Sequence, residues 1–139
     1  MNAKSRWLRR FRRAGATELD TGRGDLVVVA SSFDDAEACS TVLGRAENWT
    51  ADQPAVLRHH LRVPAEQVNA VQIIAEQEGY ETVSPDAADT LILQRVRVLD
   101  AMHCAQDHSR MVALAHRHDG QALGWDALQP AARQPGEKK

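Results

Sequence analysis

Strict alternation over residues 56–63 is the feature that most limits what this chain can fold into. One set of alternate side chains is Leu57, His59, Leu61 and Val63, and the other is Arg58, His60 and Arg62. A period of two residues predicts a half-buried β-strand, with the apolar set on a core and the basic set toward solvent. We expect His59, on the apolar side, to be a hydrogen-bonded core histidine rather than a catalytic one.

Further secondary-structure elements are predicted on both sides of this strand. The β-branched residues 26–30 predict a strand, and Ser32 with Asp35 predicts the N-terminal cap of a helix over 34–47. After residue 63 we expect a helix at 64–78, strands at 80–84 and 90–99, a helix at 100–118 and a short strand within 121–128. Their boundary residues are Pro64 in a first helical turn, Gly79 as a left-handed C-terminal cap and Asp100 as an N-cap.

From residue 56 onward the predicted order is strand, helix, strand, strand, helix, strand. This order predicts an α+β domain of the ferredoxin-like type, a split βαβ sandwich with two helices on one face of an antiparallel sheet. The strand and helix at 26–47 are an additional N-terminal pair, which either extends the sheet or covers its open face. We therefore expect a flexible basic arm and linker at 1–24, the domain at 25–128, and a flexible tail at 129–139.

Charge is distributed unevenly along the chain. The 139 residues have a formal net charge of −2, but residues 1–13 hold six basic side chains and no acidic one, so the rest of the chain is acidic. The arm residues that would contact an anionic partner are Arg6, Trp7, Arg9, Arg10, Phe11, Arg12 and Arg13. Two aromatic side chains four residues apart among arginines are typical of a peptide that seeks RNA or an anionic membrane, and a solvated tail is the alternative.

Composition and motif spacing argue against several classes of protein. No apolar run is long enough to span a bilayer and no secretory leader is visible, so we expect a soluble, cytoplasmic protein. Cys39 and Cys104 lie in apolar helical patterns and are expected to be small buried hydrophobes. The histidines of the last predicted helix do not converge with enough ligands, so we expect no metal site. With no glycine-flanked nucleophile and no phosphate-binding loop, we expect no catalytic residues, no cofactor and no small-molecule substrate.

A positive plate is predicted on the open face of the sheet. Alternation over residues 90–99 suggests that Ile92, Val96 and Val98 share one face, which leaves Arg95 and Arg97 on the other. Since the first and third strands of a ferredoxin-like sheet are central neighbours, these arginines would lie beside Arg58, His60 and Arg62. They would pair with Glu81, Asp126 or acids of the N-terminal helix, form a surface for an acidic protein, or bind RNA without aromatic stacking.

Several short motifs occur in a recognisable order over residues 40–128. A helix precedes the strand with His59-His60, the helix at 64–78 closes in Gly79-Tyr80-Glu81, and Gly124-Trp125-Asp126 follows the last helix. In this order and spacing the chain resembles the RraB family, bacterial protein regulators of ribonuclease E activity. The resemblance implies a ferredoxin-like fold and a non-catalytic protein that binds a ribonuclease E-type protein and lowers its activity on RNA.

Two functional hypotheses follow from these observations. In the first, an RraB-like regulator contacts its ribonuclease through candidate partner-binding residues, namely Arg58, His60, Arg62, Arg95, Arg97 and Trp125. In the second, a nucleic-acid-binding module uses the basic arm and the arginine-rich face of the sheet. A regulatory small-ligand domain of related topology would need a dimer and a pocket at a strand edge.

Overall fold

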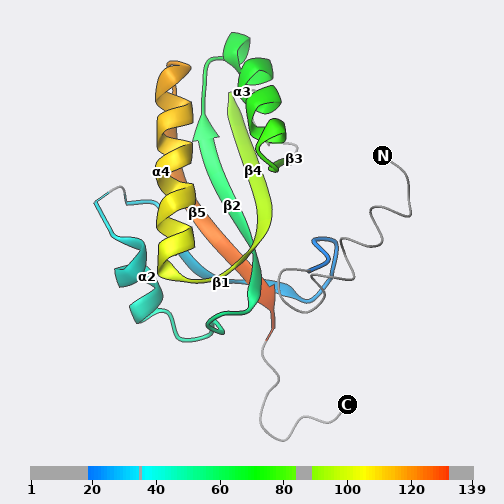
Figure 1. Ribbon diagram of the computed structural model, residues 1–139, viewed down its shortest axis with the longest axis vertical. Coiled ribbons are helices and arrows are strands. Elements are labelled where there is room, and N and C mark those ends of the chain that lie inside the picture. The colour runs from blue at the N-terminus through cyan, green and yellow to red at the C-terminus, as the bar shows by residue number, and fades with distance from the viewer. Residues whose placement is uncertain (1–18, 35, 84–88, 132–139) are drawn as a thin grey trace, which may run out of the picture.

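A computed structural model of the chain describes residues 19–34, 36–83 and 89–131. Within them, five strands form one antiparallel sheet and three helices pack against it, which confirms the α+β class (Figure 1). The elements in chain order are β1 (Leu26–Ser32), α2 (Cys39–Arg45), β2 (Pro54–Arg62), α3 (Ala65–Gln77), β3 (Glu81–Val83), β4 (Thr90–Val98), α4 (Ala101–Arg117) and β5 (Gln121–Pro130).

The strands lie in the order β1-β5-β2-β4-β3, and each neighbouring pair is antiparallel. The additional N-terminal strand therefore extends the sheet beside β5, which is one of the two placements left open by the sequence. All three helices lie on one face, where α2 contacts α4 and β1, α3 contacts β3, and α4 contacts β2 and β5 (Figure 1). We call the opposite side, on which no described helix packs, the open face.

Two predicted helix boundaries agree with the structure, and a third does not. Asp100 caps α4, since its carboxylate accepts the N–H of His103 at 2.8 Å, and Gly79 ends α3 with a φ of 95°. The predicted helix over 34–47 is wrong at its start, because α2 begins only at Cys39. Before it, the Asp34 carboxylate accepts the N–H of Ala36, which forms a turn instead of a helix cap. The predicted capping partner Asp35 lies outside the described residues.

The last strand is longer than predicted. It runs over ten residues to Pro130, because it pairs with β1 on one side and with β2 on the other. This double pairing buries most of its side chains, including Trp125.

The predicted faces of β4 are wrong. In an antiparallel ladder, residues directly opposite each other point to the same face. Leu57 of β2 lies opposite Arg95, and Arg58 lies opposite Gln94, so Arg95 and Arg97 belong to the helix-covered face. The apolar residues that define this face are instead Leu91, Leu93 and Leu99, which are fully buried.

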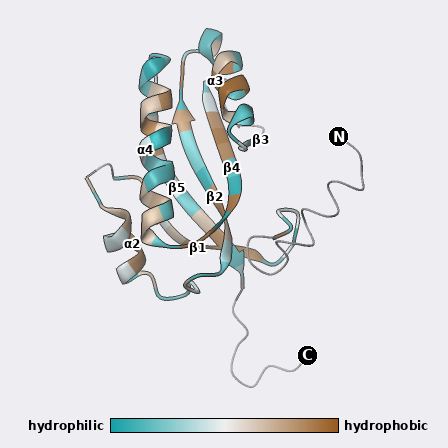
Figure 2. Cartoon of the chain, viewed as in Figure 1, coloured by the Kyte–Doolittle hydropathy of each residue, from teal (hydrophilic) through white to brown (hydrophobic). Residues whose placement is uncertain are grey.

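The hydropathy of the helices agrees with burial on one side. Along α4, hydrophilic and hydrophobic bands alternate, as expected for a helix with one face on a core (Figure 2). Within the part of the chain that the structure describes, none of the helices combines the length and apolar character needed to cross a membrane.

Candidate functional site

An acidic side chain lies at the centre of the open face, between two basic side chains of β2. Arg58 donates from Nε and Nη2 to the two carboxylate oxygens of Asp126, at 2.7 and 2.8 Å. The ring nitrogen Nε2 of His60 lies 3.3 Å from Oδ2 of the same carboxylate. Register explains this grouping, because β2 and β5 place Arg58 directly opposite Asp126. The bidentate geometry is the strong form of an arginine–carboxylate pair.

This pairing changes the charge that the open face offers to a partner. Burial raises the pKa of Asp126, but hydrogen bonds from Arg58 and His60 more than offset that effect, and the net pKa is lowered. The bond to Asp126 likewise raises the pKa of Arg58. Arg58 therefore stays charged, but its charge is already paired with that of Asp126. Pairing with an acidic residue of the same chain is one of the three interpretations left open by the sequence.

The Arg58–Asp126 pair lies in a polar row across the sheet, with Ser31 opposite Asp126 and Gln94 opposite Arg58, and apolar side chains lie on the two sides of this row. The register assigns these residues to the open face on four strands: Leu26, Val28, Val83, Ile92, Val96 and Leu128. Val28 is 51% exposed, and the other five are half-buried. Val56, near the middle of the same face, is buried, so the accessible apolar surface lies mainly toward the β1 edge and along β4.

Phe33 adds an exposed aromatic ring that the sequence analysis missed. Its ring centroid lies 5.1 Å from that of His60, and 57% of the residue is exposed. The ring occupies the space above Gly124, where an added Cβ would overlap both Phe33 and the carbonyl oxygen of Ser32. The available clue was the glycine before Trp125 in a strand, because such a glycine often marks close approach by another group.

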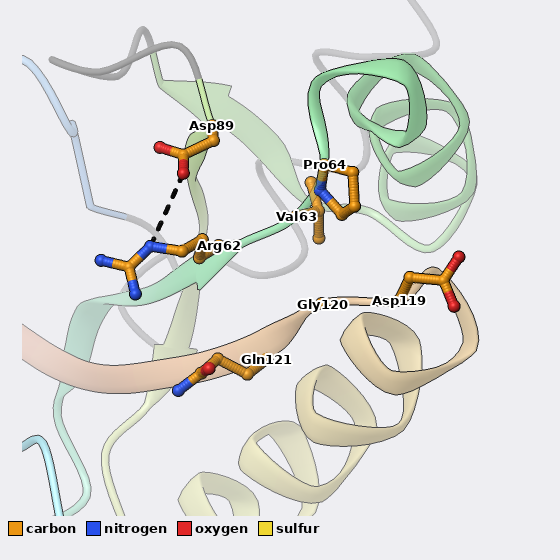
Figure 3. A pocket seen from close by; sticks show the side chains of 7 residues that line it. All are labelled: Arg62, Val63, Pro64, Asp89, Asp119, Gly120 and Gln121. Carbon is orange, nitrogen blue, oxygen red and sulfur yellow. Dashed lines mark ion pairs between the residues drawn. The ribbon is translucent and has the colours of Figure 1, made fainter.

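Arg62 lies at the end of β2, beside a small polar pocket. Its Nε lies 3.7 Å from Oδ2 of Asp89, and both side chains are more than half exposed, so this ion pair is weak (Figure 3). The pocket has a volume of about 310 Å³, and its lining consists of Arg62, Val63, Pro64, Asp89, Asp119, Gly120 and Gln121. Gly120 is required here, because a Cβ would overlap the carbonyl oxygen of Arg62 and the side chain of Val63.

Three of the six candidate partner-binding residues do not lie on the open face. Trp125 is 2% exposed and packs in the core, so it is not available to a partner. Arg97 reaches Asp107 of α4, with Nε 3.5 Å from Oδ2. Arg95 lies over the ring of Tyr80, 5.0 Å from its centroid, and donates to the carbonyl of Glu78. The predicted five-residue positive plate is therefore wrong, and only Arg58, His60 and Arg62 remain on this face.

Two buried polar side chains, Asp107 of α4 and His59 of β2, lie on the helix-covered side of the sheet. Asp107 is fully buried, and its carboxylate also accepts from Nη1 of Arg110 at 3.2 Å. His59 is 1% exposed, as its inward position predicted, but neither ring nitrogen has a hydrogen-bond partner among the described residues, so the expectation of a satisfied histidine is wrong. Burial, with repulsion from His108 and His60, lowers the pKa of His59 to about 3. The imidazole is thus neutral at physiological pH.

Two further predictions from the sequence concern the basic N-terminal arm and the absence of a metal site. The basic arm, from Arg6 to Arg13, lies outside the described residues. Among residues 19–34, 36–83 and 89–131, no three His, Cys, Asp or Glu side chains come together in a group that could hold a metal ion.

No known protein family, curated protein or solved structure matches this chain.

Proposed function

We propose that this chain is a non-enzymatic, RraB-like regulator that binds a ribonuclease of the ribonuclease E type by direct protein contact. The arrangement of residues 54–130 supports the proposal. β2 and β3, joined through α3, lie on either side of β4, whereas β4 and β5, joined through α4, lie on either side of β2. Two interleaved βαβ units of this kind support a ferredoxin-like arrangement of these strands, to which β1 would be an addition at the edge.

The open face is the observation that carries the proposal. It offers apolar side chains on both sides of a row that contains a charge pair already satisfied, and the most exposed apolar side chains are Phe33 and Val28. An exposed aromatic ring on a face that also carries apolar side chains is typical of a protein–protein contact. The basic groups favour RNA less than the sequence suggested, because Asp126 neutralises Arg58 and two arginines lie on the other side of the sheet.

Binding of the full-length protein to its host's ribonuclease E, at physiological salt, tests the proposal. Phe33→Glu and Val28→Glu should each weaken binding by about tenfold or more, since a charge would replace apolar contact. Ile73→Glu is the matched control, because Ile73 is 49% exposed on α3, on the covered side of the sheet. The proposal fails if the ribonuclease does not bind, or if both face variants bind as well as the control.

A parallel titration with single-stranded RNA tests the nucleic-acid hypothesis. That hypothesis expects RNA binding that falls steeply as salt rises and that is lost when residues 1–13 are deleted. Ribonuclease binding that survives the deletion would instead locate the contact in the folded domain. An anionic membrane contact of the arm would appear as binding of the full chain, but not of the deletion variant, to acidic lipid vesicles.

A further inference from the structure

One edge of the sheet is long, apolar and free on its outer side. In the strand order β1-β5-β2-β4-β3, β1 pairs with β5 and has no second partner among the described strands. A free edge presents backbone N–H and C=O groups that can pair with another strand. The opposite edge, β3, has only three residues and begins at Glu81, and both short length and charge oppose such pairing. β1 has seven residues, none of them charged and none a proline.

Exposed apolar side chains concentrate at the β1 edge. Among the described residues, five large hydrophobic side chains are exposed, and three of them are Val27, Val28 and Phe33. Val27 is 42% exposed and lies opposite Gln129 on the helix-covered side, whereas Val28 is 51% exposed on the open face. The strand is therefore apolar on both of its sides, and a neighbouring strand that covered these valines would be stabilised by their burial.

The ladder with β5 shows which backbone groups of β1 are free. The carbonyl of Asp25 accepts the N–H of Ala131 at 2.8 Å. In an antiparallel ladder, the bonds to one neighbour come from alternate residues. Val27 therefore also bonds to β5, while Leu26 and Val28 direct their N–H and C=O groups to the free side.

We propose that the edge of β1 binds a second copy of this chain, and that the two β1 strands pair antiparallel about a two-fold axis at Val27. Leu26 of each chain then exchanges backbone hydrogen bonds with Val28 of the other, and the two Val27 side chains lie opposite each other. These residues precede the irregularity in the ladder between Val28 and Ala30, so β1 is regular where it pairs.

The charges near β1 favour a second copy over other occupants. An uncharged strand is complementary to itself, because antiparallel pairing places valine opposite valine and leucine opposite valine, with no like charges across the ladder. The nearest charged side chains, Arg23 and Asp25, neutralise each other through hydrogen bonds of 2.8 and 2.7 Å. Since β3 offers no matching edge, copies would not add to one another without end. Two-fold pairing of β1 with β1 closes at two chains.

This inference goes beyond the proposed function and does not depend on it. Val27 lies on the helix-covered side of the sheet, whereas the ribonuclease contact is proposed for the open face. Variants of Val27 therefore test the pairing without changing a side chain of that face. A monomer that binds the ribonuclease would overturn only the present inference, and a dimer that does not bind it would overturn only the proposed function.

Sedimentation equilibrium of the full-length protein measures the pairing. The average mass should rise with concentration from that of one chain, 15.3 kDa, toward twice that value. Because a contact through one strand pair is small, we expect a dissociation constant in the micromolar range. Val27→Lys should weaken pairing by about tenfold or more, since lysine on an edge strand opposes strand addition. Ile73→Lys is the matched control, because Ile73 is 49% exposed on α3, which packs at the opposite edge.

A cysteine at the proposed axis gives a second test. Opposite residues of an antiparallel pair have Cα atoms about 4.5–5.5 Å apart, which suits a disulfide. Val27→Cys should therefore form a disulfide-linked pair of chains under mild oxidation, and Ile73→Cys should not. The native Cys39 and Cys104 are free thiols and buried, as the sequence predicted, so they should stay reduced.

Hydrogen exchange locates the contact without any variant. The amides of Leu26 and Val28 should exchange more slowly as the protein concentration rises, because pairing engages them. Equal exchange rates at low and high concentration would overturn the inference, as would a protein that stays monomeric up to about 1 mM or a dimer that Val27→Lys leaves unchanged. Dimers that form only after deletion of residues 1–18 would also overturn it, by assigning the edge to that segment.

Discussion

Replacement of His59 by leucine should stabilise this protein, although it removes a buried side chain from the centre of the sheet. His59 lies opposite Leu93 on one neighbouring strand and opposite Trp125 on the other, and its ring centroid lies 6.1 Å from that of Tyr80. Neither ring nitrogen is hydrogen-bonded among the described residues. A buried polar group without a partner destabilises the fold by about 1–3 kcal/mol, and leucine has a similar volume without that penalty.

Besides the cost of its unpaired ring nitrogens, His59 makes a second contribution to the stability difference, and this one depends on pH. The pKa of His59 is about 3 in the folded protein, against 6.5 for an unperturbed histidine, because burial disfavours the charged ring. Since the folded pKa is lowered, the unfolded chain binds more protons between these values, and folding stability is lost as the pH falls below 6.5. Between pH 7 and pH 5 the loss amounts to about 2 kcal/mol, at 1.36 kcal/mol for each pH unit below 6.5. His59→Leu removes this loss.

Urea denaturation of the two proteins at pH 7 and pH 5 measures both contributions. The variant should be more stable at pH 7, and its advantage should grow by about 2 kcal/mol at pH 5. His116→Leu is the control, because His116 is exposed, and it should keep the acid sensitivity of the wild type. Two results together would refute the argument that His59 is buried, neutral and unpaired. The variant would be less stable than the wild type at pH 7, and the difference in stability between the two proteins would be the same at pH 5.

Three further substitutions test other parts of the structure by the same denaturation assay. Gly120→Ala should destabilise by about 1–3 kcal/mol, because the added Cβ overlaps the backbone of Arg62; an unchanged midpoint would contradict this close approach. Asp126→Asn should destabilise by about 1–3 kcal/mol at pH 7 by weakening the bond to Arg58. Because the pKa of Asp126 is lowered from 3.8 in the fold, this difference should shrink as the pH falls below that value. Asp107→Asn should destabilise by about 3 kcal/mol, since Arg97 would lose its buried ionic partner, and a neutral effect would show that this ion pair does not contribute.

The alternation of β2 was predictable because its two faces differ sharply in chemistry. One face carries leucines and the other carries arginines, so a shift by one residue would bury charge and expose the core. β4 has no such contrast. Both of its alternate sets contain apolar residues, Leu91 and Leu93 in one and Ile92, Val96 and Val98 in the other. Arg95 and Arg97 belong to the leucine set. Only the pairing with β2 decides which set is covered.

The arginines of β4 are tolerated on the covered face because that face has polar partners at their position. The carbonyl of Glu78, the C-cap residue of α3, accepts a hydrogen bond from Arg95. Asp107 of α4 lies within reach of Arg97. These contacts join residues that are distant in the sequence, and no local pattern reports them. The same limit applies to Phe33, whose position over Gly124 depends on the pairing of β1 with β5. Periodicity therefore predicted the elements well, whereas the composition of the candidate site depended on strand register.

The corrected register also changes the kind of recognition that the open face supports. Arg95 and Arg97 lie on the covered face, and Arg58 is paired with Asp126. Among the described strand residues, the other basic groups on the open face are His60 and the weakly paired Arg62. Long-range attraction to an anionic partner would then be small, and the affinity would come from apolar contact at Phe33 and Val28. Binding through this face should therefore change little between low and physiological salt. Contact through the basic arm, in contrast, should weaken steeply over the same range.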